Sequence, residues 1–406
     1  MLFTLVRNEF VKIFKKAKTW IVFALFALCI VGTIIISNID AKNMRYYMSP
    51  QGQIESLNEQ IGYSQDYIDD INRYNKDEPW ASEQIESEQM RINSLKEDIK
   101  RQEERIKNEN NPNQWKEDLK DEKQNIELRI NDESIPDRYK SYDKQRLAEI
   151  NTYLEKNIEP IPNWEFDAAN YSLQFMSIIG LIILAAGISV FMSDIISGES
   201  TPPTLKFLLV QPISRGKVLL SKFIAVVLTV VTMIGSLQIL AFGVVGAIGG
   251  FGGMKMPTTI GTKYSISNAN GYPEINAIEG SGVMATRGEA LLQSFGLQIL
   301  FIIACCAFIF AISAIFKSSM ITMALSVIIS VASTMICMMS SAIGGKFAHL
   351  IFLNYGNTPE VISGNITNMF YNVNFSIGLG IALMIFTTLI SYFIAHVVFT
   401  KKDILI

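Results

Sequence analysis

The side chains that could do chemistry in this sequence are few, and neither their types nor their spacing forms a catalytic or metal site. There are four cysteines and two histidines. The cysteines all lie in apolar stretches without metal-ligand spacing, and His396 has no carboxylate at helical spacing. No G-x-x-x-x-G-K-S/T phosphate loop is present, so the chain cannot bind ATP by that route. We therefore expect no catalytic residue, no metal and no cofactor in this chain.

The charged residues are concentrated in one block of the sequence. Residues 38–171 hold 49 of the 73 charged residues and carry a net charge of −11, whereas the other 272 residues carry +8. Soluble domains do not separate charge in this way, and no basic patch is interleaved with aromatic residues. The distribution excludes a simple globular enzyme, a nucleic-acid-binding protein and a disordered protein.

Six stretches outside this block are long and apolar enough to cross a membrane. A membrane helix needs about 20 mostly apolar residues, and none of the six contains Asp, Glu, Lys or Arg. The stretches are Trp20–Ser37, Ser172–Met192, Phe223–Ile248, Ala290–Phe316, Met320–Ile343 and Ser376–Thr400. The sequence therefore predicts an all-α integral membrane protein with six transmembrane helices, unless Phe347–Leu353 also enters the membrane. Because the spans contain no carboxylate, ion-coupled transport has no visible machinery.

Basic residues beside the spans predict the orientation. Six spans place the N-terminal segment, the loop 193–222, the turn at Lys317 and the C-terminus on one side, with 12 basic and 4 acidic residues. Positive charge favours the cytoplasmic side, so we expect a bacterial cytoplasmic membrane protein with both termini inside. The predicted domains are an interfacial helix with the first span (1–37), an extracytoplasmic helical domain (38–171), and the other five spans with the cytoplasmic loop (172–406).

The N-terminal segment has an amphipathic pattern. Leu2, Leu5, Phe10 and Ile13 repeat at helical spacing, with basic residues between them. The pattern predicts a helix that lies in the cytoplasmic interface and leads into the first span. A cytosolic helix packed on a partner is the alternative. A cleaved signal peptide is disfavoured because no small-x-small cleavage site follows Ser37.

The charged block predicts a helical stalk. Isoleucines recur at intervals of seven from Ile85 to Ile106, a spacing typical of coiled-coil packing. Pro112 and Pro136 mark helix boundaries. We expect an antiparallel helical hairpin flanked by shorter helices. The stalk is either a charged spacer or a docking surface for a substrate, an envelope protein or a second subunit.

The loop after the second span carries the most informative motif. It runs from Gly198 to Lys222 as GESTPPTLKFLLVQPISRGKVLLSK. Pro202 and Pro203 suit the start of a short helix, and Pro212 suits its end. Such an amphipathic helix could insert its apolar edge into a groove of a soluble partner, or it could lie against the membrane.

This loop resembles the signature loop of the type-2 ABC-transporter permease family. The matching residues are Glu199, Thr204, Leu205, Leu208, Leu209, Pro212, Ser214 and Arg215, followed by Lys222. The family's usual Gly-Thr after the acidic residue is replaced here by Ser200–Pro203. Glu9-Phe10-x-Lys12 and Lys18-x-Trp20 resemble the family's interfacial helix and first-span entry, and the ending Phe399–Asp403 resembles its C-terminus.

The resemblance implies a membrane subunit of an ATP-driven transporter, usually an exporter. Two permease chains, identical or different, would pair with two separate ABC ATPase subunits, and those subunits would hold ATP and Mg. Glu199, Thr204, Leu205, Leu208, Leu209, Pro212 and Arg215 would belong to the coupling helix that receives the motion of the ATPase. Residues 344–372 would correspond to the family's re-entrant region near the outer gate. In members with a large external block, cargoes include peptides, antibiotics and other amphiphiles.

Two stripes of small, weakly polar residues could line a transport path or pack helices together. The fifth span carries Thr322, Ser326, Ser330, Ser333 and Cys337, and the third carries Thr229, Thr232 and Ser236. Small residues let membrane helices approach closely. Packing or dimerisation is therefore the default interpretation, and lining of a path is the alternative.

The sequence favours an export permease for a hydrophobic or amphiphilic compound, such as a peptide, an antibiotic or a lipid-like molecule. Spans without charge fit such a cargo better than a hydrated ion. The alternative function is an ABC-coupled mechanical signalling protein whose stalk regulates a cell-envelope partner without moving cargo. An integral-membrane enzyme lacks a plausible catalytic group. The expected partners are the ATPase, a second permease chain and membrane lipid, with an extracytoplasmic partner for the stalk and no nucleic acid.

Overall fold

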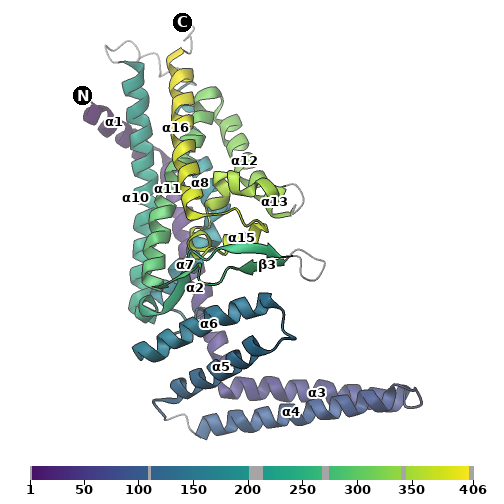
Figure 1. The fold of residues 1–406 in the computed structure, drawn as a ribbon. Coiled ribbons are helices and arrows are strands. Elements are labelled where there is room, and N and C mark those ends of the chain that lie inside the picture. The colour runs from purple at the N-terminus through teal and green to yellow at the C-terminus, as the bar shows by residue number, and fades with distance from the viewer. Residues whose placement is uncertain (1, 108–110, 201–213, 268–273, 340–343, 402–406) are drawn as a thin grey trace. The chain divides into compact units, whose positions relative to one another are not determined.

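The computed structural model describes residues 2–107, 111–200, 214–267, 274–339 and 344–401 (Figure 1). The described chain is mostly helical, which confirms the main prediction of fold class. It divides into two compact units. The first consists of Met1–Ile34, Asn125–Ile161 and Phe166–Ile406, and the second of Ile35–Gln124 and Pro162–Glu165.

Five of the described helices are long and apolar enough to cross a membrane. They are α2 (Ala17–Met48), α10 (Arg215–Gly249), α11 (Arg287–Ile315), α12 (Ser319–Met339) and α16 (Ile377–Lys401). These helices contain the first and third predicted spans and all but one terminal residue of the fourth and sixth. They also contain most of the fifth, whose last residues lie outside the described part of the chain. Five of the six predicted spans therefore have a matching helix.

The second predicted span is a broken helix. Its two parts, α7 (Ala168–Gly180) and α8 (Ile183–Met192), meet at an angle of 63°, and the described chain has a sixth span only if this pair crosses the membrane as one. At the break, the backbone of Gly180 lies against the backbone of Gly356. A Cβ atom on Gly180 would lie 2.1 Å from the carbonyl oxygen of Gly356, so only glycine fits this approach.

Helix α11 is the centre of the membrane part. It packs against α8, α10, α14 and α16, and Figure 1 shows it between α10 and α16. Phe301, Phe310, Cys305 and Cys306 are fully buried on it. All four cysteines of the chain are free thiols, and three of them are buried in this core or beside it. Close packing of apolar side chains thus holds the helices around α11.

The N-terminal segment forms its own helix, α1 (Leu2–Lys15), before α2 begins. Helix α1 packs against α10 and buries Glu9 and Ile13. The hydroxyl of Thr19 at the start of α2 donates a hydrogen bond of 2.6 Å to the carbonyl of Ile13, and this bond holds the corner between the two helices.

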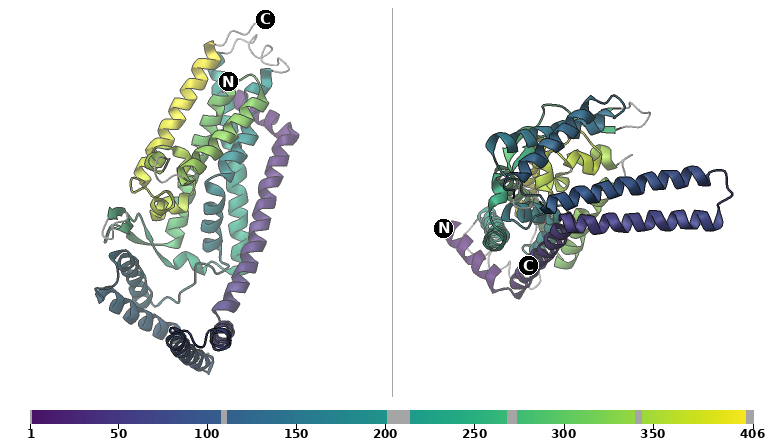
Figure 2. Two further views of the ribbon diagram at one scale, coloured as in Figure 1. Left: turned by 90° about the vertical axis from the view of Figure 1, so that its right-hand side faces the viewer. Right: turned by 90° about the horizontal axis from the view of Figure 1, so that it is seen from below.

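Within the second unit, α3 (Pro50–Tyr74) and α4 (Ala81–Lys107) form the predicted antiparallel hairpin, and Figures 1 and 2 show them side by side. Ile68, Ile71 and Ile92 are buried between the two helices. Helix α5 (Gln114–Asn131) follows Pro112, and its Asp118 accepts a hydrogen bond of 2.5 Å from Arg105 on α4. Of the α4 isoleucines at intervals of seven, Ile92 is buried, whereas Ile85, Ile99 and Ile106 are half-buried. The hairpin therefore buries this seam in part, and coiled-coil packing stays a prediction.

Within the first unit, α6 (Asp137–Lys156) packs against short strands that the sequence analysis did not predict. Strand β1 (Pro257–Ile260) pairs antiparallel with β4 (Val283–Thr286), and β2 (Tyr264–Ser267) pairs antiparallel with β3 (Glu274–Ala277). A cavity of about 680 Å³ lies between α6 and the strands, where Lys144 and Glu279 form an ion pair of 2.6 Å. A two-stranded sheet is marginal alone, so packing on α6 supports these strands.

The segment before α16 is a chain of short helical turns. They are α13 (Gly344–Phe347), η3 (Ala348–Leu350), η4 (Phe352–Tyr355), α14 (Thr358–Ser363) and α15 (Ile366–Phe370). Tyr355 and Phe370 are buried, and the ring of each lies against that of Phe375. These contacts fix the compact turns against the long helices.

Candidate functional site

The predicted coupling helix itself lies outside the described residues, because Thr204, Leu205, Leu208, Leu209 and Pro212 all fall within 201–213. The structure describes both flanks of this segment. The upstream flank is η1 (Ser197–Ser200), which contains Glu199, and the downstream flank is α10, which begins at Arg215. The site is therefore built from the contacts that hold the two flanks.

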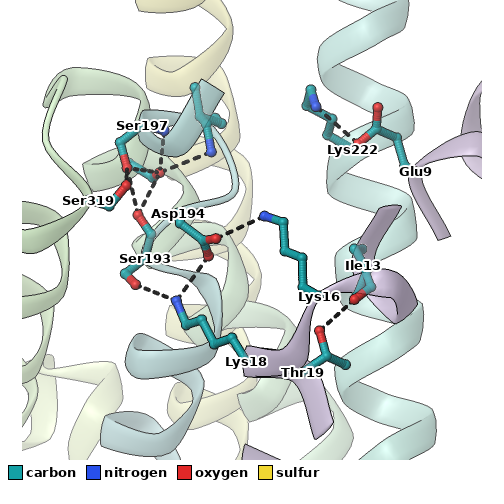
Figure 3. Close-up of polar contacts among 12 residues, drawn as sticks. Glu9, Ile13, Lys16, Lys18, Thr19, Ser193, Asp194, Ser197, Lys222 and Ser319 are labelled. Atoms are coloured by element: carbon teal, nitrogen blue, oxygen red, sulfur yellow. Dashed lines mark hydrogen bonds and ion pairs between the residues drawn. The ribbon is translucent and has the colours of Figure 1, made fainter. Parts of the chain in front are cut away.

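The upstream flank is tied to the N-terminal segment by a carboxylate between two lysines (Figure 3). Asp194 accepts hydrogen bonds from Lys16 at 2.8 Å and from Lys18 at 2.9 Å. Lys18 also donates to the hydroxyl of Ser193 at 2.8 Å. Burial by itself raises the pKa of Asp194, but the hydrogen bonds and charges of the two lysines outweigh it and lower the pKa below its ordinary value. Asp194 is thus held as an anion that joins the end of α8 to the start of α2.

A second set of contacts ties the same flank to the end of α11 and the start of α12. The hydroxyl of Ser313 accepts hydrogen bonds from the backbone N–H groups of Ile196 and Ser197, each at 3.2 Å. The hydroxyl of Ser197 donates to the carbonyl of Ser193 at 2.6 Å and meets the hydroxyl of Ser319 at 3.2 Å. These bonds satisfy backbone groups that would otherwise be buried without partners.

The downstream flank is tied to the N-terminal helix by a buried ion pair. Lys222 on α10 donates to Glu9 on α1 at 3.0 Å, and the side chains are 1% and 11% exposed respectively. Lys12 donates to the other carboxylate oxygen of Glu9 at 2.9 Å. Burial raises the pKa of Glu9, but the charge of Lys222 and the hydrogen bond from Lys12 more than offset it, so the pKa is lower than usual. Glu9 is therefore charged at neutral pH.

The start of α10 also meets the end of α16. The Nη1 atom of Arg215 donates to the carbonyl of Thr400 at 3.2 Å, and an interaction of this kind satisfies one of the last carbonyls of a helix. Gly216 lies against the ring of His396, where a Cβ atom would be 2.9 Å from Cε1. The N-terminal segment, the two flanks of the loop, the α11–α12 turn and the end of α16 therefore meet at one end of the helical bundle.

The stripe on α12 faces the protein interior. Thr322, Ser326, Ser330 and Cys337 are buried, and Ser333 is half-buried. The hydroxyl of Ser326 donates to the carbonyl of Thr322 at 2.8 Å, and that of Ser330 donates to the carbonyl of Ser326 at 2.8 Å. Because these hydroxyls are satisfied within their own helix, the stripe allows close packing of α12 against α8.

The stripe on α10 is divided. Thr229 is buried and donates to the carbonyl of Ala225 at 2.8 Å, whereas Thr232 and Ser236 lie on the exposed side of the helix. The structure therefore does not bring the two predicted stripes into one shared surface within the described chain.

Asp194 belongs to this site but was not predicted from the sequence. The sequence contains a pattern that could have predicted it, because Asp194 and Glu199 are the two acidic residues between Asp167 and Glu274. Glu9 and Lys222 were both noted in the sequence, but their pairing across 213 positions was not predicted. The serine contacts had no recognisable signal, since serines are common at helix ends.

The chain matches the family described as ABC-2 family transporter protein over residues 3–404, which is nearly its whole length. It therefore belongs to this family, whose members are the membrane components of ABC transporters. No curated protein and no solved structure matches the chain. The family assignment identifies a permease that associates with an ABC ATPase subunit.

Proposed function

We propose that this chain is the membrane subunit of an ABC exporter that moves a hydrophobic or amphiphilic compound with energy from a separate ATPase. The end of the bundle that carries Lys16, Lys18, Arg215 and Lys222 would face the cytoplasm, because basic residues favour that side. The block 38–171 would then lie outside. Two such chains, identical or different, would assemble with two ATPase subunits that bind ATP and Mg.

The observation that carries the proposal is the anchoring of both flanks of the 201–213 segment. Lys16 and Lys18 hold Asp194 on one flank, and Glu9 holds Lys222 on the other. Both flanks are thus tied to the N-terminal segment and to long helices of the membrane part. A push by an ATPase on this segment would reach α8 and α10 together, as a coupling element requires.

The class of cargo is supported by the chemistry of the described membrane helices. The five continuous spans have no acidic residue in their apolar cores, and the hydroxyls of the α12 stripe bond to their own helix. A hydrated ion would need polar ligands along its route. An apolar or amphiphilic molecule does not, which favours a lipid-like compound or a hydrophobic peptide.

The proposal is tested by reconstituting the chain with its ATPase in lipid nanodiscs and proteoliposomes. We expect a hydrophobic peptide, antibiotic or lipid from a test panel to stimulate ATP hydrolysis and to appear on the side opposite the ATPase. Sodium and other ions should have no such effect. Stimulation by ions alone, or ATP hydrolysis without transport of any compound, would contradict the proposal.

The assignment of the coupling segment has a separate test. Leu208→Asp places a charge on the apolar edge of the predicted coupling helix, and we expect loss of the co-purifying ATPase. Met90→Asp is a matched control, since Met90 is exposed on α4 in the other unit. Intact ATPase association in Leu208→Asp, or equal loss in both variants, would reject the assignment.

A further inference from the structure

A small apolar cavity lies between α7, α10 and α11. Its volume is about 200 Å³, and Phe175, Met176, Phe242 and Phe295 form much of its wall. Met254 and Gly288 lie at one end of it, close to the ends of α10 and α11. Exposed apolar side chains of Ile239 and Leu292 also line the cavity, so it is reached from the lipid-facing surface of the bundle.

One polar side chain in this wall has no partner. Gln238 on α10 is 8% exposed, and neither its Oε1 nor its Nε2 atom has a hydrogen-bond partner among the described residues. Gln238 precedes Gly249 by 11 residues, which corresponds to about 16 Å along the helix. Leaving a buried amide without a hydrogen bond costs about 1–3 kcal/mol.

The site differs from the other buried polar groups of the membrane helices. Ser294 and Gln298 on α11 each have an unpaired side-chain atom, but neither lines the cavity. Gln238 combines an unpaired donor, an unpaired acceptor and an apolar space beside it. A partner from the membrane can therefore reach it.

We propose that this cavity binds a neutral amphiphile from the membrane, with its hydrocarbon part against the phenylalanines and an amide group paired to Gln238. The ligand is neutral because no charged residue lines the cavity in the part of the chain that the structure describes. An amide fits because it supplies both the donor and the acceptor that Gln238 lacks. The volume is sufficient for a short hydrocarbon segment, since a cavity of about 150 Å³ holds one benzene molecule. Binding here does not depend on the ATPase or on transport.

The test uses the full chain in nanodiscs and a photoreactive medium-chain primary amide that carries a diazirine. Cross-linked peptides are identified by mass spectrometry, and affinity is measured by competition with the unlabelled amide. We expect labelling of α7, α10 and α11 peptides that line the cavity. Gln238→Leu should weaken binding of the amide about tenfold, which corresponds to roughly 1.4 kcal/mol for the lost hydrogen bonds.

Two further variants and a second probe control this result. Gln298→Leu makes the same substitution at a buried glutamine outside the cavity and should leave binding unchanged. Ala241→Phe fills the cavity from its own wall and should abolish labelling. An alkane diazirine of the same length should bind the wild type more weakly than the amide and should be insensitive to Gln238→Leu. Each variant is first checked for wild-type size-exclusion behaviour and thermal stability.

The site is rejected if the amide and the alkane bind equally, if Gln238→Leu has no effect, or if labelling persists in Ala241→Phe. A final arm distinguishes transported cargo from resident lipid once binding is established. Addition of the ATPase with ATP and Mg should lower occupancy if the bound amphiphile is cargo. Occupancy should stay unchanged if it is a lipid held by the cavity.

Discussion

The buried ion pair between Glu9 and Lys222 should decide whether α1 stays docked on α10. Their nitrogen–oxygen distance is 3.0 Å, and the side chains are 11% and 1% exposed. Removal of one partner from a buried pair costs about 3–5 kcal/mol, because the remaining charge is left uncompensated. At the lower value, Glu9→Gln should raise the opening equilibrium of α1 about a hundredfold, since each 1.4 kcal/mol is about a factor of ten.

Hydrogen exchange of the chain in nanodiscs measures this opening directly. At neutral pH we expect faster exchange in Glu9→Gln for the amides of α1, with little change in α11 at the centre of the bundle. Lys12→Met is the control and should change this exchange much less, because the Lys12 side chain is 46% exposed where it contacts Glu9. Because one partner of this pair is about half exposed, we expect it to contribute less than the buried pair, about 0–1 kcal/mol.

A double-mutant cycle tests the physical reason. The combined variant Glu9→Gln with Lys222→Met should be at least about 1 kcal/mol less destabilised than the sum of the two single changes, because the two groups interact directly. Strict additivity, or less than threefold change in exchange for both single variants, would refute the account of the pair.

The same carboxylate gives α1 a defined response to acid. Burial raises the pKa of Glu9, but its two lysine partners lower it by more, so the net pKa of the docked state is below the ordinary value. A group with a lowered pKa stabilises the folded state above its unfolded pKa, and this contribution is lost as the pH falls through the folded pKa. Docking of α1 should therefore be constant between pH 8 and about pH 5 and weaken below about 4.5. Glu9→Gln should remove this dependence.

Three other changes have outcomes that follow from the contacts. Gly356→Ala places a Cβ atom 2.1 Å from the carbonyl oxygen of Gly180 and should lower the free energy of unfolding by about 1–3 kcal/mol, measured by thermal unfolding. Gly378→Ala is the control, because a Cβ atom there meets nothing within 4 Å and should not destabilise the protein. Asp194→Asn should change stability by no more than about 1 kcal/mol, since the pair is partly exposed, yet lower ATP-driven transport. Ser330→Ala should keep transport within about twofold if the stripe only packs; a large loss in a stably folded variant would instead indicate a path-lining role.

Much of the helical framework could be predicted because the membrane imposes a simple pattern. Long runs without charge gave the positions of α2, α10, α11 and α16, and the intervals of seven gave the α3–α4 hairpin. Both signals are local and periodic, so one sequence is sufficient to read them. The orientation and the domain limits at 38 and 171 stay predictions.

The break between α7 and α8 could not be predicted from its own sequence. The run from Ser172 to Met192 contains no proline and no charged residue, and its hydropathy is that of one continuous span. The bend coincides with the contact between Gly180 and Gly356, which are 176 positions apart. Likewise, β1 and β4 are four residues long and pair across about 25 positions. An alternation of apolar and polar residues over only four positions is too short to predict a strand.

The candidate site was predicted in part for the same reason. The loop motif and the basic residues are visible in the sequence, but the pairings of Asp194 with Lys16 and of Glu9 with Lys222 join segments separated by more than 170 positions. A single sequence records which residues are present and not which of them meet.

The angle of 63° between α7 and α8 has a consequence for how movement passes along the second predicted span. Helix α8 is attached through Asp194 to the lysines of the N-terminal segment, whereas α7 is attached through Asn170 to Arg287 and through its backbone to Gly356. The two halves therefore belong to different sets of neighbours. A movement that tilts α8 can be taken up at the bend between the two helices and need not be transmitted to α7. The end of this span next to Asp194 can therefore move without moving the end that contacts Gly356, which would suit the proposed permease.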